Sequence, residues 1–224
     1  MYGNGKFPRM AVAAMENALS LHKDSIHLFG RQSFGSALAL SVLAAEELGK
    51  YRIIEDLLFS SNVTRPWTQA EEQDWLLAAY DHRRKQAAFC GMAEEAIATR
   101  TRARIARGAL ERDKQRGVYV GLPRSGKAID VGGPISAPRQ VSRRAAERQI
   151  TMVNDCFVTL CIGRWTGEFM LDIDRVYVTL TMRLAGQLIR RWTRMGAQAR
   201  RFMKQAVAIQ LEAGARARSK NRGA

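Results

Sequence analysis

Long apolar runs and paired cysteines are both missing from this chain of 224 residues. No window holds 18 consecutive uncharged apolar residues, so the sequence predicts no membrane-spanning helix. The N-terminus also lacks an apolar run long enough for a signal peptide. The three cysteines, Cys90, Cys156 and Cys161, show neither a paired spacing nor the spacing of a metal site. Because the sequence offers no disulfide framework, we expect a protein of the reducing cytoplasm that does not enter a membrane.

Proline is scarce and unevenly placed. Of the five prolines, three lie between residues 117 and 138, together with five glycines. This composition excludes a helix there and predicts an irregular excursion, in which residues 118–120 could form a short strand. The string GLPRSGK at residues 121–127 superficially resembles a phosphate loop. It lacks the full spacing of that motif and no helical pattern follows it, so we exclude a nucleotide site there.

Acidic residues are few in the second half of the chain. Residues 1–99 hold 10 lysines and arginines against 12 acidic residues, whereas residues 100–224 hold 26 against 9. The net charge of +15 therefore belongs almost wholly to the second half. Such an asymmetry favours a polyanionic partner, RNA or DNA first and an acidic protein or a membrane surface next. A merely solubilising surface is the simpler alternative.

Helical periodicity covers most of the remaining sequence. The stretch 34–59, FGSALALSVLAAEELGKYRIIEDLLF, has no proline and is rich in alanine and leucine, which predicts a helix that is apolar on most of its circumference. A helix over 8–29 precedes it, and the turn between them is short enough to make an antiparallel hairpin. Further helices are predicted over three ranges, which are 68–116, 139–169 and 171–213.

These elements predict the fold class, which is an all-α helical bundle of five or six helices interrupted by one irregular excursion. Thr68 and Glu71 form a capping-box signature at the start of the third helix. We expect a single helical domain over residues 8–213, with the excursion at 117–138 inside it. The tail 214–224 is basic and is expected to be disordered.

Two adjacent carboxylates, Glu46 and Glu47, interrupt the apolar helix. A buried carboxylate is costly unless a positive group or hydrogen-bond donors satisfy it. Lys50 stands three to four residues away and offers a local partner. Any second partner must come from another helix.

His82 and Lys85 are the candidates for that second partner. His82 falls in an apolar stripe of the third helix and is expected to point inward, and Lys85 follows at i+3. The other histidines, His22 and His27, are expected to be packed or surface residues. A cluster of Glu46, Glu47, Lys50, His82 and Lys85 has two interpretations. It ties helices together, or it forms a general acid–base site, since a histidine beside a carboxylate titrates near neutrality.

No metal or other cofactor is expected. A di-metal carboxylate site in a bundle would require Glu-x-x-His motifs, and the sequence contains none. A serine or cysteine nucleophile has no neighbouring base that the sequence identifies. Phosphate contacts are the sharper interpretation of several arginines, and a solvated helix face is the plainer one. These arginines are Arg83, Arg84, Arg100, Arg104, Arg107, Arg190 and Arg194.

The same residues carry a family resemblance. The pattern ALALSVLAAEELGKYRII, followed by DHRRKQ and then by RGVYVGL before a proline-containing stretch, resembles the AbiV family of abortive-infection proteins, which are bacterial phage-defence factors. The resemblance covers roughly residues 10–190. It implies a relation to the HEPN superfamily of helical bundles, many of which are metal-independent endoribonucleases and often pair as dimers. The matching motif positions are Glu46, Glu47, Gly49, Lys50, His82 and Lys85. The usual HEPN signature, an arginine followed four to six residues later by histidine, does not occur in this chain.

Three functions follow as expectations. The first is a phage-defence protein that acts on RNA or the translation apparatus, in its enzymatic form as a metal-independent endoribonuclease. The second is a non-catalytic basic protein that binds RNA, a ribosome or a phage protein. A DNA-binding regulator ranks last, because no helix-turn-helix with a clear recognition helix is evident. A homodimer is compatible with each of them.

Overall fold

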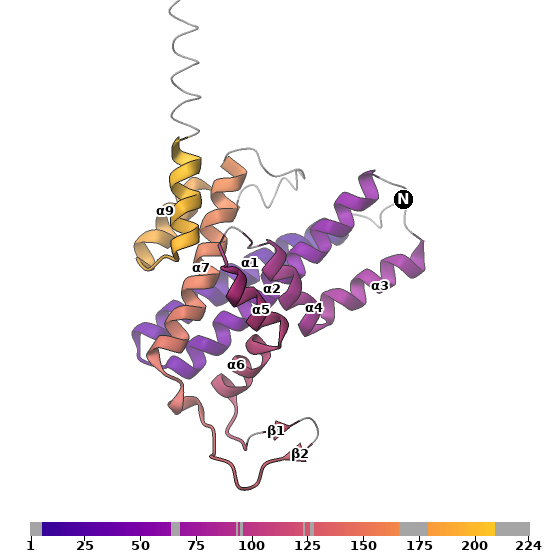
Figure 1. Ribbon diagram of the computed structural model, residues 1–224. Coiled ribbons are helices and arrows are strands. Elements are labelled where there is room, and N and C mark those ends of the chain that lie inside the picture. The colour runs from indigo at the N-terminus through magenta and orange to yellow at the C-terminus, as the bar shows by residue number, and fades with distance from the viewer. Residues whose placement is uncertain are drawn as a thin grey trace, which may run out of the picture.

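The computed structural model describes residues 6–63, 68–92, 94, 96–122, 124–125, 128–165 and 179–208. Its described residues form an all-α fold, which confirms the predicted class (Figure 1). No helix in these ranges combines the length and the apolar character that crossing a bilayer requires. All three cysteines are buried free thiols. The predicted tail, 214–224, lies outside the described residues.

The first two helices make the predicted antiparallel hairpin. They are α1 (Lys6–Gly30) and α2 (Phe34–Val63), and they pack along each other over much of their length. The turn between them is closed by Gln32, which adopts a left-handed φ of 62°. Helix α2 is the central element, since α1, α3, α4, α6 and α7 all contact it. This central position explains why α2 is apolar on most of its circumference.

The predicted helix over 68–116 is wrong in its continuity, because four shorter helices replace it. These are α3 (Gln69–Tyr80), α4 (His82–Met92), α5 (Thr99–Ala106) and α6 (Ala109–Val118). The predicted capping box of Thr68 and Glu71 does start α3. Asp81 ends α3, and its carboxylate accepts a hydrogen bond of 2.8 Å from the backbone N–H of Arg84. Gly108, with φ of 76°, separates α5 from α6. The extra breaks raise the number of helices above the five or six expected.

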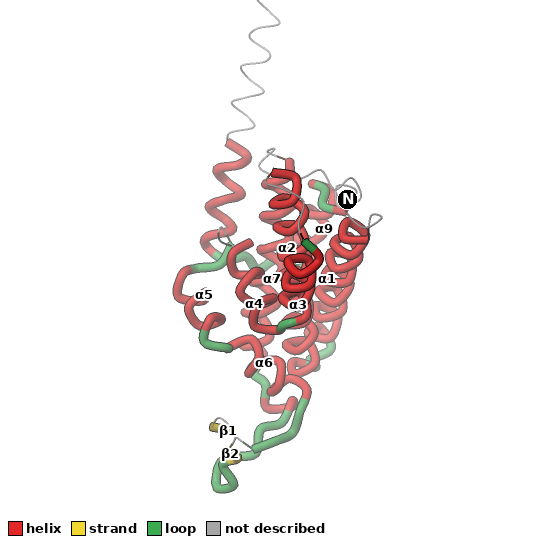
Figure 2. The backbone as a smooth tube through the Cα atoms, turned by 90° about the vertical axis from the view of Figure 1, so that its right-hand side faces the viewer, coloured by secondary structure: helices red, strands yellow, loops and turns green. Residues whose placement is uncertain are grey.

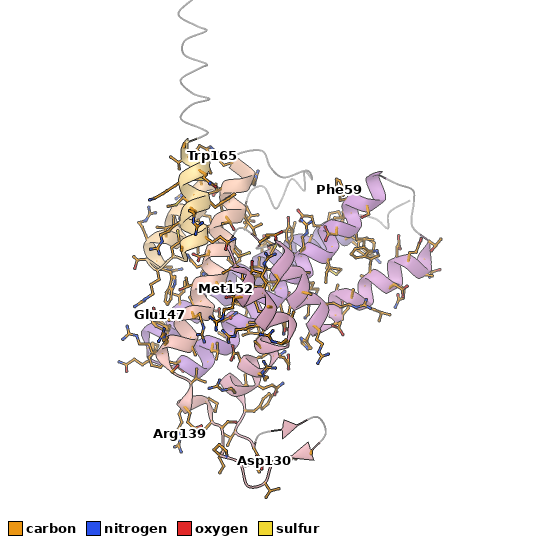
Figure 3. The ribbon with its side chains drawn as sticks, in the orientation of Figure 1. Phe59, Asp130, Arg139, Glu147, Met152 and Trp165 are labelled. Carbon is orange, nitrogen blue, oxygen red and sulfur yellow. The ribbon has the colours of Figure 1, made fainter. Side chains whose placement is uncertain are left out.

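The glycine- and proline-rich excursion follows α6 and projects from the bundle (Figure 2). It contains a minimal antiparallel hairpin of β1 (Arg124–Ser125) and β2 (Ala128–Ile129), with a bridge between Gly121 and Ser136 nearer the bundle. The strand suggested for residues 118–120 is not formed, since Val118 is the last residue of α6. Asp130, labelled in Figure 3, lies near the outer end of the excursion.

The remaining helices return the chain to the bundle. The 3₁₀ turn η1 (Pro138–Gln140) leads into α7 (Arg143–Trp165), which starts four residues later than predicted. Helix α9 (Met182–Arg191) contacts α7, and residues 197–208 are again helical. The predicted helix over 171–213 is therefore interrupted at residues 180–181 and again at residues 192–196. Its part before residue 179 lies outside the described residues.

Two glycines let helices approach α2 closely. A Cβ built on Gly49 would lie 1.8 Å from the carbonyl oxygen of Lys85 in α4. A Cβ built on Gly117 of α6 would lie 2.6 Å from the carbonyl oxygen of Gly35. Both distances are impossible for a real side chain, so α4 and α6 can occupy their places beside α2 only because these positions are glycine.

We therefore expect Gly49→Ala to lower the free energy of unfolding by about 3 kcal/mol or more, because α4 must move away from α2. Gly91→Ala is the matched control, since a Cβ there meets no other atom of the fold within 4 Å. It should leave the protein unchanged or stabilise it by up to about 1 kcal/mol. Urea denaturation measures both, and equal effects would refute the close contact.

Candidate functional site

The carboxylate of Glu46 lies at the centre of a buried polar cluster. Glu46 is only 1% exposed. Its Oε2 accepts a hydrogen bond of 2.7 Å from His82 Nδ1 and lies 3.6 Å from Lys85 Nζ. Its Oε1 accepts hydrogen bonds of 3.0 Å from Gln86 Nε2 and from Lys114 Nζ. The carboxylate is therefore satisfied by groups from two other helices, as a buried charge requires.

The backbone explains how these groups meet. Because α4 runs against α2 at Gly49, Lys85 and Gln86 are carried to the level of Glu46, one turn earlier on α2. The break at Asp81 makes His82 the first residue of α4. On another side of α2, α6 is brought close by Gly117 and supplies Lys114. In the motif E-E-L-G-K, the first glutamate therefore provides the charge and the glycine provides the room.

A second carboxylate joins the cluster through Lys114. Lys114 Nζ lies 2.8 Å from Glu111 Oε2, 3.0 Å from Glu46 Oε1 and 3.4 Å from His82 Nδ1. Glu111 also accepts a hydrogen bond from Gln115. Gln86, Glu111 and Lys114 were not among the predicted members of the cluster. Lys114 is the one lysine in the arginine-dense run 99–118 and stands at i+3 from Glu111, which is the only local signal for it.

Two of the predicted members take other places. Glu47 is half-buried, and it is not among the described partners of His82 and Lys85. Lys50 places its ammonium group 5.1 Å from the centroid of the Tyr80 ring, instead of pairing with Glu46. The predicted contact of Glu46 with His82 and Lys85 is present. The cluster thus has one buried carboxylate at its centre, where a pair was expected.

The exposure of His82 is the feature that separates it from its neighbours. Its side chain is 56% exposed, while those of Lys85 and Lys114 are 10% and 12% exposed. His82 was predicted to point inward, but only its Nδ1 does so. His22 is instead fully buried, bonds to Asn154 through Nε2, and has its pKa lowered to about 4 by burial. His27 is exposed on α1. Among the three histidines, His82 alone combines a buried carboxylate partner with access to solvent.

Charge within the cluster is fixed by competing effects. Burial alone would raise the pKa of Glu46, but the hydrogen bonds from Gln86, Lys114 and His82 outweigh it, and the pKa lies below its ordinary value of 4.5. Burial likewise acts to lower the pKa of Lys114, but the hydrogen bonds to Glu111 and Glu46 outweigh it, and the pKa lies above 10.5. At neutral pH, Glu46 is a carboxylate and Lys114 is an ammonium ion.

Chemically, the arrangement resembles the carboxylate–histidine pair of general acid–base sites. A carboxylate that accepts from Nδ1–H fixes the orientation and tautomer of the imidazole and stabilises its protonated form. Nε2 takes no part in this pairing and is the nitrogen left for a substrate. Ligand atoms of Glu46, His82 and Glu111 lie within 4.8 Å of one another, which is close enough to hold a metal ion. The Lys114 ammonium group bridges both carboxylates, so a metal ion would have to displace it.

The arginines that were predicted to bind nucleic acid are spread over the surface. Arg83 and Arg84 are exposed and directly follow His82. Arg100, Arg107 and Arg190 are exposed on other elements, whereas Arg104 lines a cavity described below. Arg194 forms an ion pair of 2.7 Å with Glu147, and its guanidinium group lies 5.3 Å from the Trp192 ring centroid. Arg194 is therefore held by contacts within the protein although its side chain is 43% exposed, and only Arg83 and Arg84 adjoin His82 in the chain.

Comparison with known families adds one finding. The model of the HEPN AbiV family, described as AbiV, matches residues 6–158. The chain belongs to the AbiV family. The match spans α1 to α6 and most of α7, so it includes every member of the Glu46 cluster. The family assignment supports a role in phage defence by abortive infection. No curated protein and no solved structure matches this AbiV-family chain.

Removal of the central charge gives a direct test of the cluster. Glu46→Gln leaves Lys85 and Lys114 largely buried with one carboxylate fewer, and we expect the free energy of unfolding to fall by about 3 kcal/mol. Glu47→Gln is the matched control and should change it by less than about 0.5 kcal/mol. Denaturation of wild type and both variants at neutral pH measures these changes. An equal loss in free energy of unfolding for the two variants would refute the central role of Glu46.

The stability difference between wild type and Glu46→Gln should also depend on pH. Since the folded pKa of Glu46 lies below its unfolded value, its stabilising effect is complete above pH 4.5 and is lost as the pH falls through the folded pKa. The difference in free energy of unfolding between wild type and Glu46→Gln, measured by urea denaturation, should therefore shrink as the pH falls below about 4.5. A difference that does not shrink there would contradict the lowered pKa of Glu46.

Proposed function

We propose that this AbiV-family protein acts in the cytoplasm on RNA, as a metal-independent endoribonuclease whose acid–base group is His82. The observation that supports this proposal is the hydrogen bond of 2.7 Å from the exposed His82 ring to the buried carboxylate of Glu46. An imidazole at the surface that a carboxylate orients can act as a general acid or base toward a bound substrate.

The reaction that suits these groups is cleavage by the RNA's own 2′-hydroxyl. His82 Nε2 takes the proton of the 2′-hydroxyl, and the 2′-oxygen forms a bond to the adjacent phosphorus. The bond from phosphorus to the 5′-oxygen breaks, water donates a proton to that oxygen, and the hydroxide that remains takes the proton from the His82 imidazolium. Glu46 stabilises the imidazolium that forms. Arg83 and Arg84, exposed beside His82, are the groups available to stabilise the charge on the phosphorane.

Lys85 has a supporting role in this proposal. Its side chain is only 10% exposed and its ammonium group lies 3.6 Å from Glu46. It therefore helps to hold Glu46 ionised, and it is a positioning residue. Tyr80, which is 66% exposed and lies two residues before His82, offers a ring on which an unpaired base can stack. Single-stranded RNA is consequently the preferred form of the substrate in this proposal.

A non-catalytic function is the second candidate. It is favoured by the completeness of the Glu46 cluster, because His82, Lys85, Gln86 and Lys114 already satisfy this carboxylate. In that case the cluster joins α2, α4 and α6, and the basic second half of the chain binds RNA, a ribosome or a phage protein.

The histidine variants separate the two candidates. Incubated with total RNA in the presence of EDTA, His82→Ala should cleave at least about a hundredfold more slowly than wild type, which is the usual contribution of a general acid–base group. His27→Ala replaces another exposed histidine and should cleave at the wild-type rate. The melting temperature of His82→Ala should stay close to that of wild type. Absence of cleavage by wild type, or equal cleavage by all three proteins, would exclude the enzymatic form.

Salt dependence tests the RNA contact itself, whether or not cleavage occurs. The affinity for a single-stranded RNA should fall steeply with ionic strength, since each phosphate contact contributes about 0.7 to the slope of log K against log salt. Arg83→Ala/Arg84→Ala should reduce that slope by about 1.4. Arg31→Ala, an exposed arginine in the acidic half of the chain, is the control. An unchanged slope for the double variant would exclude a contact of these arginines with phosphates.

A further inference from the structure

A separate cavity lies on another face of α6. It has a volume of ≈ 300 Å³, opens to solvent and is lined by residues of α5, α6 and α7 and of the stretches 96–98 and 196–201. Asp113 lines it, whereas the next residue, Lys114, reaches Glu46. Met152, labelled on α7 in Figure 3, forms part of its wall. The cavity includes no member of the Glu46 cluster, so its occupant need not be the substrate of His82.

Two buried polar groups of α7 line this cavity with unused hydrogen-bonding capacity. Asp155 is 1% exposed, and its Oδ2 accepts a hydrogen bond of 2.8 Å from the backbone N–H of Gly196. Its Oδ1 has no partner within the described part of the chain. Gln149 is 5% exposed, and its Nε2 is likewise without a partner among those residues. Buried polar atoms are nearly always hydrogen-bonded, so an unpaired acceptor and an unpaired donor in the wall of one cavity point to a ligand that pairs with both.

The rest of the lining defines the kind of ligand. Apolar side chains form part of the wall, and they include Ile97, Ile105, Leu110 and Met152. Three arginines, Arg104, Arg148 and Arg201, also line the cavity, against the two acidic residues Asp113 and Asp155. Such a site suits a flat heterocycle that meets both polar groups and carries an anionic substituent. Burial raises the pKa of Asp155 to about 7, against the Gly196 hydrogen bond and the charge of Arg200, so further hydrogen-bond donors would stabilise this carboxylate.

We propose that this cavity binds a guanine base that carries a phosphate group. The N1–H and N2–H groups of guanine donate to the Asp155 carboxylate, and O6 accepts from Gln149 Nε2. The purine ring packs on the apolar wall, and the phosphate meets the arginines. Adenine fits less well, because its ring nitrogen N1 is an acceptor and would face a carboxylate. The base belongs either to a free guanine nucleotide or to a guanosine residue within an RNA strand.

Exchange of the carboxylate for an amide tests the proposed pairing. Titration calorimetry on the full chain should show that wild type binds guanosine monophosphate at least about tenfold more tightly than adenosine or xanthosine monophosphate. Asp155→Asn should bind guanosine monophosphate at least about tenfold more weakly and should gain affinity for xanthosine monophosphate, whose O2 accepts where guanine donates. Asp24→Asn, an exposed aspartate on α1, should behave as wild type.

Further arms identify the phosphate contact and the source of the base. Arg201→Ala should abolish the advantage of guanosine monophosphate over guanosine. A uridine hexamer with one central guanosine, compared with the plain hexamer, separates an RNA ligand from a free nucleotide.

If Asp155→Asn fails to fold, Gln149→Leu serves instead and should weaken guanine binding. His82→Ala should bind as wild type, so failure of the proposed ribonuclease leaves this result unaffected. Wild type that binds neither guanosine monophosphate nor the guanosine-containing hexamer, or binds guanine and adenine equally, would overturn the proposal.

Discussion

A single buried carboxylate determines how the helices of this protein meet. Glu46 lies on a largely apolar buried surface of α2, where an unpaired charge would cost several kcal/mol. The side chains that bond to Glu46 come from two separate helices, α4 and α6, which otherwise contact α2 through apolar side chains. The cluster therefore specifies which faces of α4 and α6 turn toward α2, and Gly49 and Gly117 allow the approach. The contacts that orient α4 and α6 against α2 are therefore the same contacts that form the candidate site.

The acidic centre and two of its partners could be predicted from the sequence, because a buried carboxylate requires positive or hydrogen-bonding partners. A carboxylate on an apolar helix face must be neutralised, and His82 and Lys85 were the inward candidates on the next helical pattern. The sequence alone does not show which of Glu46 and Glu47 is the buried glutamate. Adjacent helical residues point about 100° apart, so the direction from which α4 and α6 approach decides which of them is buried. That direction is a tertiary property.

The partners that sequence reasoning missed share a cause. Glu111 and Lys114 stand in an arginine-dense stretch that is typical of a solvated helix, and Gln86 carries no charge to attract notice. The break at Asp81 was missed for a similar reason, since Asp81 fits a helical pattern until its side chain is seen to cap α4. The cavity beside α7 was invisible as well, because Gln149 and Asp155 become neighbours of Arg104 and Arg201 only in the folded chain.

The order of the cluster along the chain has a consequence for synthesis on the ribosome. Glu46 emerges early, but its partners His82 and Lys114 follow 36 and 68 residues later. The α1–α2 hairpin can form from contacts that are local in the chain, yet it cannot bury this glutamate favourably by itself. The hairpin must wait with one charged face in water until α6 has left the exit tunnel. A nascent chain of this protein consequently has no assembled acid–base pair until more than half of it has been translated.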